Sequence, residues 1–149
     1  DWSDLPLFTA GAHLAVPVRL ADGSVVTRQY SLTSHPQRRD MFEIAVLREE
    51  NAHGGSAAVH ATWQIGTLLA LDHPVNQFPL HDDDRPAVLI AGGIGITPIR
   101  AMALQLKAHG NAFDLHYSGR TATDMPYFCL LYTSPSPPDR TRHRMPPSA

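Results

Sequence analysis

The sequence contains a single cysteine among its 149 residues. One thiol cannot build a disulfide framework within the chain, nor supply the ligands of a Cys-only metal or iron–sulfur site. No apolar run approaches the roughly 20 residues that a membrane-spanning helix requires, so we expect no membrane segment. The formal net charge is −2, and this lack of a basic excess argues against a nucleic-acid partner.

The remaining composition suits a folded protein. Hydrophobic residues make up 43% of the chain, which suffices for a core and excludes wholesale disorder. A chain of this length usually forms one domain or two small ones. No His-Glu-x-x-His sequence occurs, and we predict no metal site.

Prolines concentrate at the end of the chain, where residues 129–149 show little periodicity. The codons TGT CTC TTA TAC ACA TCT would encode residues 129–134, and that string resembles the transposon end used to prepare sequencing libraries. We therefore interpret residues 129–149 as translated adaptor rather than native protein, and we expect them to contribute no packing. A disordered native tail is the alternative interpretation.

Residues 1–84 contain short alternating stretches separated by turn residues. Asp22-Gly23 is a strong hairpin signal, and a short helix is predicted at residues 57–63. Several short strands favour a small antiparallel β-barrel, whose first strand we expect to lie upstream of Asp1. The strands are predicted at residues 13–20, 25–32, 41–47 and 67–71.

The pattern changes in residues 85–128. A continuous apolar run at residues 87–91 is typical of a buried parallel strand, and a glycine loop follows at residues 92–95. A helix should then run to about His109, with Thr97 as its cap, before a strand at residues 113–117. This order predicts the start of a doubly wound α/β nucleotide-binding domain, truncated because two strands and one helix cannot cover both faces of a sheet.

Three segments contain residues suited to a nucleotide. Glycines before a helix, at residues 54–55 and 92–95, let a phosphate approach free N–H groups at the positive end of the helix. In residues 28–31 (RQYS), an arginine can clamp a phosphate, a tyrosine can stack on a planar ring and a serine can bond a ring nitrogen. Each segment alone has an ordinary alternative: a tight turn, a helix start or a surface strand.

In their order and spacing, four segments together resemble the ferredoxin reductase superfamily, most closely the phthalate dioxygenase reductase group, over about residues 5–128. They are residues 28–32 (RQYSL), 54–56 (GGS), 76–80 (NQFPL) and 92–99 (GGIGITPI). Members of that group pass electrons from NADH through FMN to a 2Fe–2S cluster that serves an oxygenase. The resemblance thus implies an FMN-binding β-barrel domain at 1–84 and the start of an NAD-binding α/β domain at 85–128.

The resemblance also implies residue roles. Arg28 and the 54–56 loop would bind the FMN phosphate region, and Tyr30 would lie along the flavin. Ser31 and Thr97 would lie where hydride is transferred, and they are the candidate catalytic residues. Arg120 is a weaker candidate for the ribose or phosphates of NADH. The predicted cofactor-binding residues are Arg28, Gln29, Tyr30, Ser31, Gly54, Gly55, Ser56, Gly92, Gly93, Gly95, Thr97 and Arg120.

The chain departs from the group at two places. Its members often have an arginine before the Gly-Gly-Ser loop, where this chain has His53. The cysteine ligands of the 2Fe–2S cluster are absent, so we expect that cluster only in a longer parent. The expected partners are NADH and an oxygenase component or ferredoxin, in the cytoplasm. Two alternatives stay open: an FAD-type ferredoxin reductase relative, or a truncated, non-catalytic flavin-binding module.

Overall fold

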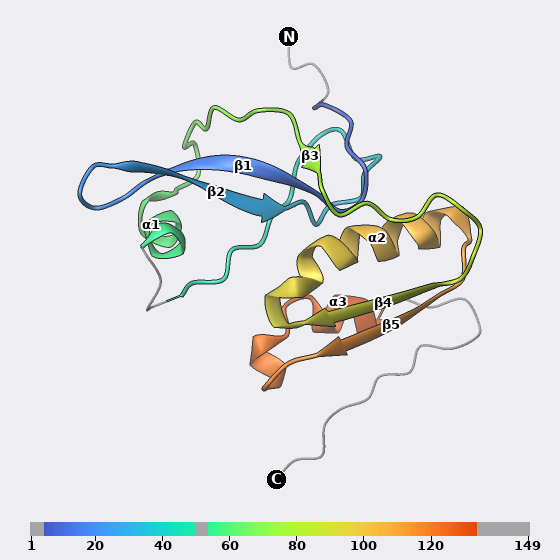
Figure 1. Cartoon of the computed structure of the whole chain (residues 1–149). Helices are drawn as coiled ribbons and strands as arrows, with labels where there is room; N and C mark the ends of the chain where they lie inside the picture. Colours follow the sequence, from blue (N-terminus) through green and yellow to red (C-terminus); the bar gives the residue numbers. More distant parts are fainter. Residues whose placement is uncertain (1–4, 50–53, 134–149) are drawn as a thin grey trace.

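The computed structural model describes residues 5–49 and 54–133, which form two units (Figure 1). The first unit contains a sheet of three antiparallel strands with β1 between β2 and β3. The second contains the parallel strands β4 and β5, with helix α2 packed against one face of the pair. The elements are β1 (Ala12–Arg19), β2 (Val25–Ser31), α1 (Gly55–Thr62), β3 (Val75–Asn76), β4 (Ala87–Gly92), α2 (Ile96–His109), β5 (Phe113–Ser118) and α3 (Phe128–Thr133), with 3-10 turns at Gly93–Gly95 and Ala122–Asp124.

The predicted hairpin is confirmed as β1–β2. The Asp22 carboxylate accepts hydrogen bonds from the Ser24 backbone N–H at 2.9 Å and from its hydroxyl at 2.6 Å. Gly23 adopts φ 85°, a left-handed conformation that glycine tolerates without a steric cost. The turn sets a register in which Arg28 lies opposite Val16, so the face on which each β2 side chain lies is fixed.

The third β-rich run, residues 41–47, forms one isolated bridge rather than a strand. That bridge joins Leu32 to Ile44. The alternation of the run still determines which side chains face inward, since Phe42, Ile44 and Val46 all pack against the buried core of the first unit. Periodicity therefore predicted burial here, but not backbone pairing.

The strand predicted at residues 67–71 is wrong. No strand forms over those residues, and Leu68 is 96% exposed, so the segment has no buried face that would stabilise a ladder. The short β3 follows instead and pairs with β1. The antiparallel part of the expected fold class is confirmed, whereas closure of the sheet into a barrel is not seen within residues 5–49 and 54–84.

The NQFPL segment, residues 76–80, holds the start of β1 in place. The Asn76 amide donates to the Thr9 hydroxyl at 2.6 Å and to the Ala10 carbonyl at 3.0 Å, and its oxygen accepts from the Phe78 N–H at 3.0 Å. Gly11 lies against this segment with φ 97°, and a Cβ there would stand 1.9 Å from the Phe78 carbonyl oxygen. These contacts fix the start of β1 against the connection to the second unit.

The β–loop–α–β order predicted for residues 85–128 is confirmed. Strands β4 and β5 pair in parallel over their full length, from Ala87 opposite Phe113 to Gly92 opposite Ser118. Helix α2 ends as expected at Gly110, which has φ 74° and donates its N–H to the helix. The apolar face of α2 covers the inner face of this strand pair.

The proposed cap of α2 is wrong in detail. The helix begins at Ile96, so Thr97 already lies in its first turn. The Thr97 hydroxyl donates to the Ile94 carbonyl at 3.0 Å instead of capping a helical N–H. Pro98 is tolerated there because N–H groups of the first turn have no partner within the helix.

The prediction that residues 129–149 contribute no packing is wrong at one position. Residues 128–133 form α3, and Phe128 and Leu131, three residues apart, pack against the core of the second unit. Apolar residues at that spacing share one helix face. The adaptor interpretation concerns the origin of this segment and stays a prediction, and residues 134–149 lie outside the described residues.

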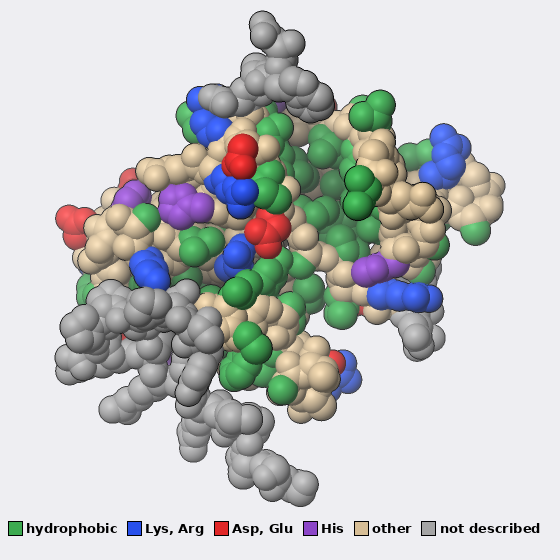
Figure 2. Space-filling model, turned by 180° about the vertical axis from the view of Figure 1, so that it is seen from behind, with side chains coloured by type: hydrophobic (Ala, Val, Ile, Leu, Met, Phe, Trp, Pro, Cys, Tyr) green, Lys and Arg blue, Asp and Glu red, His purple; other side chains and the backbone are tan. Residues whose placement is uncertain are grey.

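On the face seen in Figure 2, basic, acidic and hydrophobic side chains are interspersed, and charges of one sign do not form a patch among the described residues. Within residues 5–49 and 54–133, no helix combines the length and the apolar character needed to cross a membrane.

Candidate functional site

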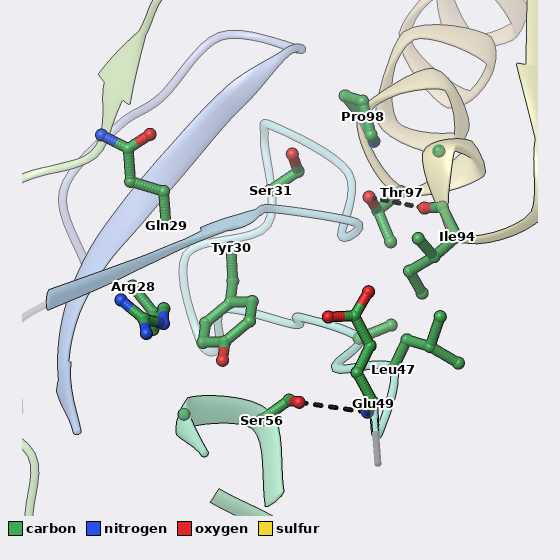
Figure 3. Close-up of a pocket in the computed structure, with 13 residues that line it drawn as sticks. Arg28, Gln29, Tyr30, Ser31, Leu47, Glu49, Ser56, Ile94, Thr97 and Pro98 are labelled. Atoms are coloured by element: carbon green, nitrogen blue, oxygen red, sulfur yellow. Dashed lines mark hydrogen bonds between the residues drawn. The ribbon is translucent and has the colours of Figure 1, made fainter. Parts of the chain in front are cut away.

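A cavity of about 430 Å³ lies between the two units (Figure 3). The end of β2 and the start of α1 form its walls on one side, and the glycine loop with the start of α2 forms the other. A volume in the range of about 300–1,000 Å³ is typical of small-molecule sites. The lining residues are Arg28, Gln29, Tyr30, Ser31, Ala45, Leu47, Glu49, Gly55, Ser56, Ile94, Gly95, Thr97 and Pro98.

Arg28 and Gly55 form one end of the cavity. A Cβ at Gly55 would lie 2.6 Å from the Arg28 Nε, so a side chain at residue 55 would displace the Arg28 side chain from the start of α1. Gly54, just before the helix, adopts φ 77° as its N-cap. Arg28 has no carboxylate partner among residues 5–49 and 54–133, and its one hydrogen bond is to the Thr27 carbonyl at 3.3 Å. A cation thus lies beside free helical N–H groups, which suits an anion.

Tyr30 lies on the same side of β2 as Arg28, as the two-residue period requires, while Gln29 points away from them (Figure 3). Burial raises the pKa of the Tyr30 phenol, and the positive charge of Arg28 opposes this in part. The tyrosine ring is therefore neutral at physiological pH and presents a flat surface to the cavity. Gln29 is a lining residue, but because its side chain points away from Arg28 and Tyr30 it is a poorer candidate for a ligand contact than either of them.

Two hydrogen bonds hold the segment at residues 45–49 against α1. The Ser56 hydroxyl accepts from the Glu49 N–H at 3.1 Å, and His60 Nε2 lies 2.8 Å from the Val46 carbonyl. Sequence reasoning assigned Ser56 to a phosphate, and the structure gives its hydroxyl this second use. It missed Leu47 and Glu49, which line the cavity from the same segment (Figure 3). Only the correct path of residues 45–49 could have revealed them.

The two candidate catalytic residues lie on opposite walls. Ser31 ends β2, and Thr97 projects from the first turn of α2 (Figure 3). The Thr97 hydroxyl proton is used by the Ile94 carbonyl, which leaves its oxygen able to accept. The glycine loop is itself held by the buried Tyr117, whose hydroxyl donates to the Gly93 carbonyl at 3.0 Å. Burial raises the pKa of Tyr117 to about 12, so this phenol is neutral at physiological pH.

A second cavity of about 1120 Å³ continues from the first. It is lined by the carboxyl ends of β4 and β5, the edge at which α/β sheets bind ligands. Ala45, Leu47, Glu49 and Ile94 line both cavities, so the two adjoin. The other lining residues are Val46, Arg48, Gly92, Gly93, Ser118, Gly119, Arg120, Thr123, Asp124 and Pro126.

The structure therefore divides the predicted site residues between two adjoining cavities. Arg120, Gly92 and Gly93 lie in the second, and Gly54 supports the first without lining it. His53 lies outside the described residues. The residues that meet in the first cavity are Arg28, Gln29, Tyr30, Ser31, Gly55, Ser56, Gly95 and Thr97.

Comparison with known proteins identifies the arrangement. The chain is 39% identical to phthalate dioxygenase reductase, a modular structure for electron transfer from pyridine nucleotides to [2Fe–2S], with a TM-score of 0.79 over 88% of this chain and 40% of that chain. The resemblance to the phthalate dioxygenase reductase group is confirmed. No protein-family model matches the chain.

Two curated relatives support the same grouping. The reductase subunit of phthalate 4,5-dioxygenase from Pseudomonas putida is 45% identical over 117 residues, which are 78% of this chain and 35% of that protein. The reductase subunit of tert-butanol monooxygenase / tert-amyl alcohol desaturase from Aquincola tertiaricarbonis is 45% identical over 122 residues, which are 82% of this chain and 35% of that protein. The chain thus spans about a third of the length of these two relatives.

Proposed function

We propose that this chain is the flavin- and nucleotide-binding part of an oxidoreductase that passes electrons from NADH through FMN to the iron–sulfur centre of an oxygenase system. The observation that carries the proposal is the pair of adjoining cavities, one ending at Arg28 and Gly55 and the other built on the glycine loop. A flavin accepts two electrons as hydride and releases them singly, so it can join a nicotinamide to an iron–sulfur centre.

The residues of the first cavity fit FMN. The Arg28 guanidinium and the N-terminus of α1 suit its phosphate, and the flat face of Tyr30 suits its ring system. The close approach of Arg28 to Gly55 leaves no room for a side chain at the phosphate end. FMN is favoured over FAD because the short Gly-Gly-Ser loop offers little sequence to hold an adenosine.

The second cavity fits a pyridine nucleotide. Gly92 and Gly93 allow a phosphate to approach the backbone, and Arg120 and Asp124 lie across the same cavity. A nucleotide there would extend past Ile94 toward Thr97 and meet a flavin beside Ser31. The protein's task is geometric, because it has to hold the two rings face to face and limit water between them.

Cofactor titration tests the proposal. FMN and FAD are titrated into the chain by flavin fluorescence, and reduction of the bound flavin by NADH is followed by stopped flow. We expect FMN to bind more tightly than FAD, and Ser31→Ala and Thr97→Ala to slow reduction more than they weaken FMN binding. Unchanged reduction rates in both variants would leave these side chains as structural.

The second candidate function is a flavin-binding module without catalysis. Tight FMN binding without reduction by NADH would select it over the reductase function.

A further inference from the structure

A polar cluster joins the two units beside the cavity, and the site residues discussed so far do not include it. It consists of Thr33 and Glu43 from the first unit and Arg100 and Tyr127 from the second. Thr33 comes two residues after Ser31, and Arg100 comes three residues after Thr97 on α2. Three residues of helix rise about 4.5 Å, so Arg100 lies less than one turn of α2 from Thr97.

Arg100 makes the contacts that cross between the units. Its guanidinium donates to the carbonyl of Thr33, a residue with no exposed surface. It also lies 3.3 Å from the Glu43 carboxylate, and its side chain is only 16% exposed. One guanidinium nitrogen, Nη1, therefore binds two acceptors on two separate segments of the first unit, and the flat guanidinium can also stack on an aromatic ring, which a lysine ammonium cannot do in the same way.

Tyr127 completes the cluster from the other side. Its ring lies under the Arg100 guanidinium at 4.5 Å, and its hydroxyl donates to Glu43 at 3.0 Å. Tyr127 holds this place with φ 64°, a conformation that is uncommon for a residue other than glycine. Burial raises the pKa of its phenol, so the group remains a donor. Strain retained at a contact marks a place where the surrounding structure determines the conformation.

We propose that Arg100, supported by Glu43 and Tyr127, is a positioning residue that sets the separation between the Ser31 and Thr97 walls of the cavity. Interfaces between domains of one chain usually permit relative motion unless something fixes them. Displacement of about 1 Å at a hydride-transfer site can cost about 100-fold in rate. The cluster holds the two units together close to the cavity walls that contain Ser31 and Thr97, whose separation has to stay constant.

The first test measures the separation without any ligand. Spin labels are attached at Val25 and Lys107, both exposed and remote from the cluster, in a Cys129→Ser background. Because these sites lie at the far ends of β2 and α2, a small rotation at the cluster becomes a larger displacement between the labels. Arg100→Ala should broaden the distance distribution by about twofold.

The second test measures flavin reduction and rests on the proposed function. Arg100→Ala should slow reduction of bound FMN by NADH by about tenfold or more, with FMN affinity within about twofold of the unaltered chain. That split separates positioning from binding, because Arg28 and Gly55 lie within one unit. Arg100→Lys should recover part of the rate, and Tyr127→Phe keeps the ring while removing the bond to Glu43.

Arg38→Ala is the matched control, because it removes an exposed arginine–aspartate pair that stays within the first unit. It should change neither the distances nor the rate. If Arg100→Ala fails to fold, Arg100→Lys and Tyr127→Phe are measured in its place. Unchanged distances in the folded variants overturn the positioning role. If the unaltered chain binds FMN but NADH does not reduce it, the proposed function fails, and the distance measurement still decides the positioning role.

Discussion

The main chains of the two units are held by different kinds of hydrogen bond. In the β4–α2–β5 unit, one parallel ladder and a 14-residue helix order most of the main chain. In the first unit, side chains do much of this work in loops: Asn76 bonds to the Ala10 carbonyl, Ser56 to the Glu49 N–H and His60 to the Val46 carbonyl. The first unit therefore depends on individual polar residues, whereas the second depends on the packing of α2.

The difference suits the site between them. The glycine loop is short and is held by strand β4, helix α2 and the Tyr117 hydroxyl, so its carbonyls and N–H groups have fixed directions. The flavin side is a strand edge next to loops, and it can be shaped around a ring system. A site on rigid elements is generally more accurate than a site on loops. We therefore expect substitutions in the second unit to affect mainly stability, and substitutions on the flavin side to affect mainly ligand binding.

The largest expected effect is the destabilisation of the second unit by a substitution in its core. Leu106 is buried at 2% exposure in the core under α2, and Leu106→Ala should lower the free energy of unfolding by about 2–5 kcal/mol. Urea denaturation measures this, and hydrogen exchange locates it. Lys107→Ala, one residue along and exposed, is the control. If β1 and β2 lost as much protection as β4 and β5, the chain would unfold as one unit and the comparison would break down.

The second prediction concerns the flavin side alone. Arg28→Ala should weaken FMN binding about 10- to 100-fold, because a hydrogen bond to a charged group contributes about 1.5–3 kcal/mol. Arg28→Lys should recover only part, since lysine lacks the planar fork. Fluorescence titration gives the dissociation constants. Gln29→Ala is the matched control, because that side chain points away from the cavity (Figure 3). An equal loss of FMN affinity in both variants would show that binding depends on the strand as a whole and not on the Arg28 guanidinium.

Sequence reasoning succeeded where elements are regular and fell short where side chains close the loops. The alternating pattern predicted the strand that contains Arg28 and Tyr30, and the glycine loop predicted a helix that begins near Thr97. By contrast, the run at residues 41–47 alternates correctly but its backbone pairs at a single bridge. Its position depends on long-range bonds such as Thr33 to Glu43, which no local pattern encodes. Glu49, Arg100 and Tyr127 were missed for the same reason.

A third prediction concerns the pH dependence of stability in the second unit. Burial raises the pKa of Tyr117 to about 12, whereas an unfolded tyrosine titrates near 10. The folded chain therefore holds this proton more tightly, so the stabilisation is complete below pH 10 and is lost as the pH rises toward 12. Tyr117→Phe should lower stability at neutral pH by about 1 kcal/mol and remove this part of the alkaline loss. Free energies of unfolding from pH 8 to 12 test both, and parallel pH curves for the two proteins would contradict the assignment.

A fourth prediction concerns α3, which adds Leu131 to the core of the second unit. Ending the chain at Phe128 should lower the free energy of unfolding by about 1 kcal/mol, because Leu131 is only partly buried. Leu131→Ala in the full chain should reproduce most of this loss. A loss of unfolding free energy as large as that of Leu106→Ala would show that residues 129–149 are an integral part of the core of the second unit.

The smallest expected effect is on the choice of nucleotide. We expect NADH to bind more tightly than NADPH, because the Asp124 carboxylate in the second cavity would repel a 2′-phosphate and accept from a ribose hydroxyl. That carboxylate already accepts a bond from the Thr121 hydroxyl at 3.0 Å, which fixes its direction. Arg120 lines the same cavity and opposes the effect, since it can welcome the phosphate.

Both side chains are exposed, so each is worth little on its own. Asp124→Ala should shift the ratio of NADPH to NADH affinity toward NADPH by only about two- to fivefold, the range for exposed charge interactions. Arg120→Ala should shift it the opposite way. The dissociation constants of both nucleotides are measured for the chain and for each variant at one ionic strength, because salt screens the effect. A preference for NADPH in the unaltered chain would overturn the assignment, whereas an NADH preference untouched by Asp124→Ala would keep the cofactor and remove Asp124 from its recognition.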